Sequence, residues 1–373
     1  MRLLLAILIV IIIYLLQWTM TRKLWSRGLT VSLSFADPHV ETGERSVISE
    51  VVENAKFLPL PIFHVKFSTS RHFIFDDREN STVTDAFHRN DAFSVMGNER
   101  ITRKLSFRAD KRGYYNISNV NILTKDFFMT RTFAKTIDSN AWIYVLPKKL
   151  KLPEERAVLS SLYGDILVKR SLSEDPYSFR GLREYQSGDT MKHINWKASA
   201  RADQLMVNLY EYAAMLKVQV LLNLEANIML REDYMEELAI SAASTIAQEL
   251  LEKGVPVGLK SNGIDVISGQ PVGAMYGATR SHAATVDMAL ARIGKKSGIE
   301  SFLNLVDEVG KTLDKNTTLI VVSPYYKEDL TTRLDNLKKR GMDVHMLVPY
   351  FDIQETTSFR PYMRGLEVKL NEA

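Results

Sequence analysis

The 373-residue chain contains no cysteine, and this absence excludes a group of chemistries at once. Disulfide bonds, thiolate metal sites, catalytic thiols and cysteine-ligated iron–sulfur clusters all need that side chain. An excess of charge of one sign is missing as well, because 48 Lys and Arg residues stand against 44 Asp and Glu residues, a net charge of +4. Nucleic-acid-binding domains usually carry a clear basic excess. We therefore predict no nucleic-acid partner.

The sequence also lacks the familiar nucleotide-binding and catalytic motifs. It has no GxxxxGK(S/T) phosphate loop, no GxGxxG after a strand, no HExxH and no GxSxG. The histidines are scattered without ligand-like spacing, at His39, His64, His72, His88, His193, His282 and His345. Because no set of nucleophile, base and orienting group can be assembled from these residues, we predict that the chain is not an enzyme and holds no cofactor.

One long apolar run stands near the N-terminus. Residues 3–20 read LLLAILIVIIIYLLQWTM without a charge, and as a helix they would span about 27 Å, close to one hydrocarbon core. Trp18 and Trp25 are placed as in an interfacial aromatic belt. A cleaved signal peptide is the alternative, but the run is long for one and no small-x-small cleavage site follows it. We predict a transmembrane anchor over residues 1–25, with the lipid bilayer as a partner.

The charges that flank this run predict its orientation. Arg2 precedes it, whereas Arg22, Lys23 and Arg27 follow it. Cytoplasmic flanks of membrane helices carry the excess of Lys and Arg. We therefore expect a single-pass protein of the cell membrane with the bulk of the chain in the cytoplasm.

The next part of the chain is rich in short β-like runs and lacks helical periodicity. Alternating or clustered β-branched and aromatic residues occur at 31–35, 46–56, 62–68, 101–109, 114–123 and 141–147. Turn sequences such as Asp37-Pro38 and Lys111-Arg112-Gly113 separate them. This pattern predicts an all-β, immunoglobulin-like sandwich over residues 30–147.

Beyond residue 211 the pattern changes to alternating strands and helices. Residues 218–224, VQVLLNL, form a continuous apolar run of the kind found in buried parallel strands. Helical periodicity over 233–253 ends at Gly254, and the apolar runs at 318–323 and 343–348 continue the alternation. We predict a doubly wound α/β domain over residues 212–373, joined to the sandwich by a linker and signature segment at 148–211.

The segment 175–211 is densely polar, yet it is studded with Trp and Tyr. Gly188-Asp189 reads as a turn with Asp189 as the N-cap of a following helix, and Arg183 and Arg201 can pair with Glu184 or Asp189. Two interpretations of this segment remain. The segment is either a structural clasp in which Trp196 wedges against the neighbouring sheet, or a docking surface whose Arg and aromatic residues are binding hot spots.

RGLREYQSGDTMKHINWKASARADQLMV in this segment resembles the signature of the domain of unknown function 58 family, R-E-Y-x-x-G-D-x-x-x-x-I-x-W-x-x-S-A-R. The matching positions are Arg183, Glu184, Tyr185, Gly188, Asp189, Ile194, Trp196, Ser199, Ala200 and Arg201. KRGYYNISNVNILTKDFF, further upstream, resembles the family's sandwich segment, so the likeness extends over residues 30–350. The resemblance implies a membrane-attached protein with a von Willebrand factor A-like α/β domain. It also implies a MoxR-type AAA+ ATPase, and often a transglutaminase-like membrane protein, as partners.

The von Willebrand factor A resemblance raises the question of a metal site. Such domains often bind Mg²⁺ through D-x-S-x-S after the first parallel strand, and here that position reads Asn223-Leu224-Glu225-Ala226-Asn227, with Ser323 after a later strand. One carboxylate with two amides is a weak cage for Mg²⁺, and Ca²⁺ tolerates amide oxygens better. The site is either a degenerate relic in which Asn223 and Asn227 bond the loop, or a functional site for Mg²⁺ or Ca²⁺.

Three functional hypotheses follow from these observations. The leading one is a non-enzymatic, membrane-tethered scaffold or adaptor that works with a MoxR-type AAA+ ATPase in protein assembly or maturation. The alternative is a divalent-metal-dependent adhesion or protein-binding module of the cell surface. An enzyme is the third, and no catalytic residues can be named for it.

Overall fold

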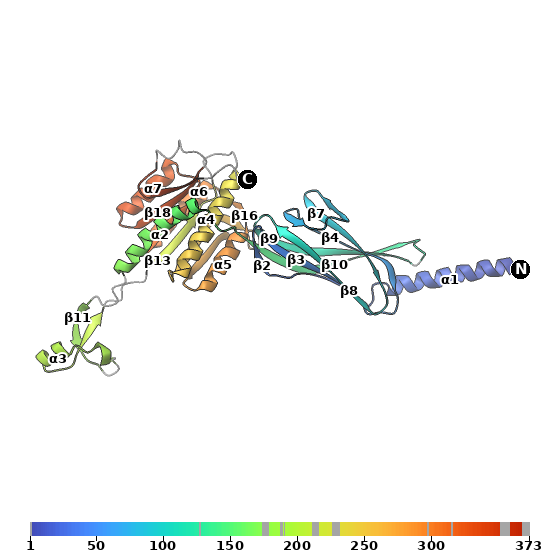
Figure 1. Cartoon of the computed structure of the whole chain (residues 1–373), viewed down its shortest axis with the longest axis horizontal. Helices are drawn as coiled ribbons and strands as arrows, with labels where there is room; N and C mark the ends of the chain where they lie inside the picture. The colour runs from blue at the N-terminus through green and yellow to red at the C-terminus, as the bar shows by residue number, and fades with distance from the viewer. Residues whose placement is uncertain are drawn as a thin grey trace. The chain divides into compact units, whose positions relative to one another are not determined.

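The computed structural model describes residues 2–126, 128–173, 179–186, 189, 191–210, 216–225, 232–296, 298–314, 316–350 and 359–367. The chain divides into two compact units, Met1–Lys148 and Lys149–Ala373 (Figure 1). The first contains an apolar helix and a β-sandwich, and the second a mixed α/β domain with a parallel sheet. The predicted order of helix, sandwich and α/β domain is confirmed at this level.

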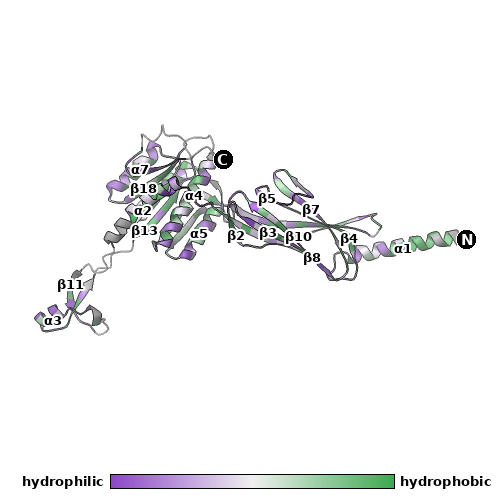
Figure 2. Ribbon diagram, viewed as in Figure 1, coloured by the Kyte–Doolittle hydropathy of each residue, from purple (hydrophilic) through white to green (hydrophobic). Residues whose placement is uncertain are grey.

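Helix α1 (Arg2–Leu24) contains the predicted apolar run. The large aliphatic side chains of residues 4–20 are exposed, from Leu4 at 72% to Met20 at 44%, and the N-terminal part of the helix is almost uniformly apolar (Figure 2). Within it, Ile7–Leu24 is long and apolar enough to cross a membrane, a property that membrane anchors and signal sequences share. The helix ends at the sandwich, where Trp25 is buried and stacks on Phe133 with ring centroids 6.1 Å apart.

The strands of the first unit form two sheets in its described residues. One sheet has the order β1-β3-β8-β5 and the other the order β2-β10-β9-β4-β7-β6. Neighbouring strands are antiparallel except for β2 and β10, which are parallel. The bounds are β1 (Leu29–Phe35), β2 (His39–Glu41), β3 (Arg45–Asn54), β4 (Leu60–Ser70), β5 (Phe73–Phe75), β6 (Ser81–Val83), β7 (Ala86–Val95), β8 (Glu99–Ala109), β9 (Gly113–Lys125) and β10 (Thr132–Leu146).

Alternation of buried and exposed residues explains why these segments are strands. In β3 the side chains from Ser46 to Asn54 are buried at every second position, which directs one face of the strand into the sandwich. The core between the sheets is rich in aromatic rings. The ring centroids of Phe73 and Phe107 lie 4.5 Å apart, and those of the stacked Phe75 and Phe87 lie 4.3 Å apart. Such pairs add to the stabilisation from area burial alone.

The second unit is built around a mainly parallel sheet of order β15-β14-β13-β17-β18-β19, with β16 paired to β14. β15 and β16 are antiparallel to β14, and the other pairs are parallel. The strands are β13 (Lys217–Leu222), β14 (Val257–Asp265), β15 (Pro271–Gly277), β16 (Ile293–Lys296), β17 (Thr317–Val322), β18 (Asp343–Tyr350) and β19 (Met363–Glu367). The helices are α2 (Pro153–Ser173), α4 (Glu232–Glu252), α5 (Arg280–Ala291), α6 (Ile299–Thr312) and α7 (Glu328–Lys339).

Helices cover both faces of this sheet, so the central strand β13 is buried from Val218 to Leu222. Val220 and Leu222 of β13 share a core with α2, α4 and α5, whereas Leu221 shares a second core with α6 and α7. Successive side chains of a strand point to opposite faces. This arrangement gives the continuous apolar run from which the sequence predicted a buried parallel strand.

Helix α2 lies within the segment that the sequence analysis assigned to a linker. Its buried residues Leu159, Leu162, Tyr163 and Ile166 belong to the core of the α/β unit. Their spacing of three, one and three residues is that of one helical face. The helix is therefore an integral part of the second unit, and the pattern that predicts it is present in the sequence.

Candidate functional site: the signature module and the strand-end cluster

The signature residues form a small hairpin with a helical insertion, called here the signature module (residues 179–210). Strand β11 (Phe179–Glu184) pairs antiparallel with β12 (Met206–Tyr210), and between them lie the short helices η1 (Met191–His193) and α3 (Trp196–Ala202). Ile194 bridges to Val207, and both side chains are buried. This pair is the apolar centre of the module.

An ion pair closes the loop after β11. Arg183 donates from Nη1 to Asp189 Oδ2 and from Nη2 to Asp189 Oδ1, each at 2.6 Å, and the Gln186 backbone N–H donates to Asp189 Oδ2 at 2.8 Å. These bonds, led by the Arg183 guanidinium, lower the pKa of Asp189 to about 2. The predicted pairing of Arg183 with Asp189 is confirmed, and the planar guanidinium favours this two-bonded geometry. Gly188 lies outside the described residues.

The helix N-cap in the module is Asn195, so the prediction that Asp189 caps the helix is wrong. Asn195 Oδ1 accepts from the Ala198 N–H at 2.9 Å, while its Nδ2 donates to Asn208 Oδ1 on β12 at 2.8 Å. Ser199 Oγ donates to the Asn195 carbonyl and accepts from the Met206 N–H, both at 2.8 Å. Asp189 instead pairs with Arg183, while Asn195 and the signature residue Ser199 join α3 to β12.

Trp196 is exposed by 64% in the described structure. The docking interpretation predicts an exposed ring at this position, whereas the clasp interpretation predicts a ring packed against a sheet. Met191 is exposed by 65%, and Leu182 and Leu205 are also exposed. Large exposed apolar residues gathered in one small module are typical of contact surfaces. We call Leu182, Met191, Trp196 and Leu205 the apolar set of the module.

The remaining signature residues play smaller parts. Glu184 Oε1 accepts from Gln204 Nε2 at 2.9 Å, and the Tyr185 backbone N–H donates to the Leu205 carbonyl at 2.8 Å. Arg201 is exposed in the last turn of α3. These contacts join the end of β11 to the start of β12.

The strand-end residues of the α/β unit form a closed hydrogen-bond cluster. Asn223, directly after β13, donates from Nδ2 to Ser323 Oγ at 2.9 Å and accepts at Oδ1 from Asn262 Nδ2 at 2.9 Å. Asn262 Oδ1 accepts from the Leu224 N–H at 3.0 Å. All three polar side chains are buried. The cluster lies where strand order reverses between β13 and β17, the general binding crevice of such sheets.

The candidate metal ligands do not assemble into a carboxylate-rich cage in the part of the chain that is described. Glu225 faces Lys296, with Oε2 and Nζ 3.9 Å apart, and Ser323 Oγ also donates to the Tyr325 carbonyl at 2.6 Å. Asn227 lies outside the described residues. The donor atoms of Asn223 and Ser323 are thus already bonded to protein groups, and a hard cation would have to displace those bonds.

A lysine, a serine and an aspartate meet at the start of the second unit, as in some catalytic sets. Lys149 Nζ lies 2.6 Å from Asp287 Oδ2, and both groups contact Ser244 Oγ. Ser244 is fully buried in α4, and the neighbouring Leu150 N–H donates to Thr245 Oγ1 at 3.1 Å. A buried hydroxyl cannot reach a substrate. The group therefore ties residues 149–150 to α4 and α5.

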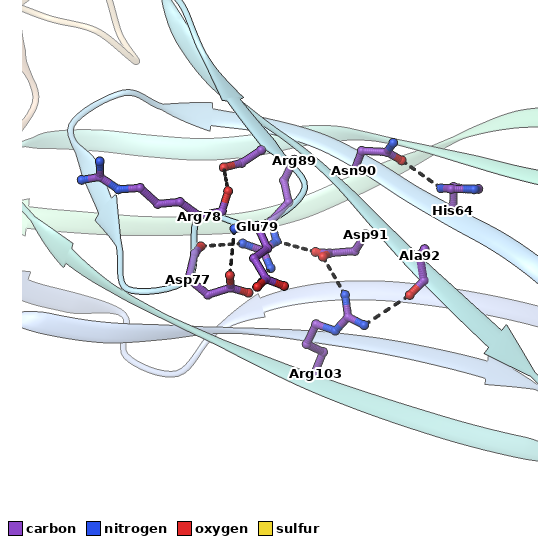
Figure 3. A network of polar contacts seen from close by, with 10 residues as sticks. His64, Asp77, Arg78, Glu79, Arg89, Asn90, Asp91, Ala92 and Arg103 are labelled. Atoms are coloured by element: carbon purple, nitrogen blue, oxygen red, sulfur yellow. Dashed lines mark hydrogen bonds and ion pairs between the residues drawn. The ribbon is translucent and has the colours of Figure 1, made fainter.

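A buried charge network crosses the sandwich, and the sequence analysis missed it (Figure 3). Arg89 Nε donates to Asp91 Oδ2 at 2.5 Å, and Arg103 Nη1 donates to Asp91 Oδ1 at 2.6 Å. Arg89 also reaches Asp77 Oδ2 at 2.8 Å. Burial, and then the charge of Asp91, raise the pKa of Glu50 to about 8. The signal was present in β7, because Arg89 and Asp91 lie between Phe87 and Phe93 on the inward face of the strand.

A hollow of about 550 Å³ lies on the six-stranded sheet, and its lining is rich in amides and hydroxyls. Asn116, Asn119 and Asn121 come from β9, and His88 bonds Ser68 within it at 2.7 Å. Its lining contains no carboxylate, so it lacks the charged oxygens that a hard cation prefers. The asparagine spacing within YYNISNVNIL is the sequence signal for this polar face.

Comparison with known protein families finds a match to one of them. Residues 181–349 match the family described as protein of unknown function DUF58, so the resemblance predicted from the signature is confirmed for these residues. The sandwich lies outside the match, although the predicted likeness included it. A search of curated proteins found no match.

Solved structures similar to part of the chain include the CARDB domain of a Pyrococcus furiosus protein in complex with di-metal ions. It is 12% identical, with 30% of this chain and 93% of that chain covered and a TM-score of 0.20. A non-cellulosomal cohesin from Archaeoglobus fulgidus is also 12% identical, with 31% and 91% covered and a TM-score of 0.22. Similarities at these TM-scores carry no argument about this chain.

Proposed function

With residues 181–349 a DUF58 family domain, we propose that the chain is a non-enzymatic, membrane-tethered adaptor whose signature module docks a MoxR-type AAA+ ATPase. In this proposal α1 is a retained single-pass anchor of the cell membrane and the bulk of the chain is cytoplasmic. The ATPase supplies the nucleotide hydrolysis for protein assembly or maturation. A transglutaminase-like membrane protein is the second proposed partner.

The proposal rests on a contrast within the signature module, between polar side chains that bond one another and a tryptophan ring that stays exposed. The polar groups of four residues form hydrogen bonds within the module, namely those of Arg183, Asp189, Asn195 and Ser199. Trp196, in the middle of the same signature, remains 64% exposed. A rigid frame that presents an exposed indole is the usual form of a binding hot spot, because Trp supplies a large contact area at low conformational cost.

The architecture of the α/β unit supports a finer fold assignment. Without β16, the sheet order β15-β14-β13-β17-β18-β19 is 3-2-1-4-5-6 in order of appearance, a doubly wound arrangement. We propose that this unit is von Willebrand factor A-like, and that the sandwich is of the immunoglobulin-like kind. The metal-dependent adhesion alternative has less support, since Asn223 and Ser323 already bond each other.

Substitution of Trp196 by Ala tests the docking proposal. The full chain, purified from membranes with and without nucleotide, should co-purify a MoxR-type AAA+ ATPase identified by mass spectrometry. We expect Trp196→Ala to lose about 2 kcal/mol or more of binding free energy, as hot-spot truncations do. Its melting temperature should stay close to wild type, because the exposed ring makes little contribution to the core.

The matched control is Met275→Ala, which removes a side chain that is 91% exposed on β15 of the same unit. It should leave ATPase capture unchanged. Unchanged capture by Trp196→Ala, or no ATPase with the wild-type chain in either nucleotide state, would contradict the proposal.

A further inference from the structure

Three loops lie at the end of the sandwich from which α1 emerges. β1 begins at Leu29, just after the helix, and Leu29 pairs with Asn54 at the end of β3, which pairs in turn with Glu99 at the start of β8. The loops after β3 and before β8 are bound to each other, because Asn54 Nδ2 donates to the carbonyls of Leu58 and Met96 at 3.0 and 2.8 Å. The third is the turn between β9 and β10, which contacts α1 directly.

Each of these loops exposes large apolar side chains. Phe57 is exposed by 87%, Met96 by 63%, Met129 by 57% and Phe128 by 48%. We call these four residues the apolar rim. The turn that carries two of them is held rigidly, since Asp126 accepts from Thr130 Oγ1 at 2.6 Å and from the Arg131 N–H at 2.9 Å. These bonds join the two ends of that turn.

The β9–β10 turn lies beside α1, next to residues that belong to its apolar run. The rings of Phe128 and Tyr14 are 6.2 Å apart, and Tyr14 Oη lies 3.3 Å from Thr130 Oγ1. Arg131 places its guanidinium 4.8 Å from the ring centre of Trp18. Tyr14 precedes the end of the uncharged run, Met20, by about 9 Å of helix. A bilayer that surrounds α1 would consequently reach the tip of this hairpin.

We propose that the apolar rim is a lipid-contacting surface, embedded in the membrane interface beside α1. This inference rests on the proposed membrane anchor and extends it from the helix to the sandwich. The part of the rim on the β9–β10 turn is continuous with the exposed apolar surface of α1 through the Tyr14–Phe128 contact. Arg22, Lys23 and the exposed Arg131 lie around the same level, where cations meet phosphate headgroups and Trp and Tyr rings prefer to lie.

The absence of cysteine allows a direct test with single-cysteine variants of the full chain. Met129→Cys and Phe57→Cys are labelled with an environment-sensitive fluorophore in nanodiscs of mixed zwitterionic and anionic phospholipid. Phospholipids with a spin label on the acyl chain then quench any fluorophore that touches lipid. Leu8→Cys in α1 reports the anchor itself. Lys111→Cys is the matched control, since it is exposed at the opposite end of the sandwich, between β8 and β9.

We expect strong lipid quenching at positions 129, 57 and 8, several-fold above that at position 111. Quenching at 129 and 57 no greater than at 111, with position 8 still quenched, would overturn the rim as a lipid surface and leave the anchor standing. Absence of quenching at position 8 would instead remove the anchor and the inference with it. Labels at 129 and 57 that are shielded from both lipid and aqueous quenchers would assign the rim to a protein contact and also overturn the proposal.

Discussion

Asn223 shows how a residue at a ligand-like position can serve the fold instead. Its amide satisfies Ser323 and Asn262 at once, and all three side chains are buried. The sequence predicted that this position is a degenerate relic or a metal site, because an amide stands where Mg²⁺ favours a carboxylate. Asn262 could not be predicted as its partner, since it lies on another strand and nothing in its local pattern marks it.

We predict that Asn223→Ala lowers the free energy of unfolding by about 1–3 kcal/mol, the usual cost when buried polar partners lose their bonds. The change in the free energy of unfolding is measured by urea denaturation, with circular dichroism as the probe of unfolding. Asn304→Ala, at an exposed position of α6, is the control and should stay within about 0.5 kcal/mol of wild type. Equal effects of the two substitutions would show that the cluster does not stabilise the sheet.

Glu50 gives a prediction about pH. Its pKa is raised from 4.5 to about 8, first by burial and then by the charge of Asp91. The folded state therefore holds a proton that the unfolded state releases between these values. The stabilisation by this group is complete below the unfolded pKa and is lost as pH rises through the folded pKa.

We expect the wild-type free energy of unfolding to fall by about 1–4 kcal/mol between pH 5 and pH 9 on account of Glu50, since each pKa unit is worth about 1.4 kcal/mol. Glu50→Gln, neutral at every pH, should flatten this dependence. Glu53→Gln, on an exposed position of the same strand, should keep the wild-type slope. A Glu50→Gln variant with the wild-type slope in urea titrations would contradict the assignment.

At the scale of elements, the sequence predicted the strands whose side chains follow a regular hydrophobic pattern. It missed a strand whose inward positions carry charged residues. Strand β3 was predicted because its side chains alternate, and β13 because it is apolar throughout. Strand β7 was missed because its inward positions include Arg89 and Asp91, which only a partner such as Arg103 makes tolerable. The position of Trp196 could not be predicted either, because a short helix gives no periodicity that separates a wedge from an exposed ring.

The close approach of two of the three rim loops, the one after β3 and the one before β8, can be tested with a glycine. A Cβ at Gly97 would lie 2.3 Å from the Phe57 carbonyl oxygen, so one backbone would have to shift. We predict that Gly97→Ala destabilises the first unit by about 1–3 kcal/mol, the cost of overpacking. Gly164→Ala in α2, where a Cβ meets nothing within 4 Å, should instead stabilise its helix by about 0.5–1 kcal/mol. Thermal melts of both variants check the opposite signs, and a neutral Gly97→Ala would refute the predicted clash.

At the scale of the whole molecule, the proposals join an apolar helix, a sandwich and an α/β unit into one membrane-held platform. Composition predicted this order because long apolar runs, alternating strands and β/α alternation differ strongly along the chain. The partner could not be predicted from composition. It is inferred from the family resemblance and from an exposed indole in a polar frame. An ATPase partner requires that this frame face the nucleotide-containing cytoplasm.

The most direct measurement is therefore the accessibility of the signature module in intact cells. A single cysteine at the exposed Lys197, next to Trp196 in α3, is treated with a membrane-impermeant maleimide before and after permeabilisation. The account predicts that Lys197→Cys is protected in intact cells and labelled only after the membrane is opened. Labelling in intact cells would place the module outside, where no cytoplasmic ATPase could reach it, and would contradict the account.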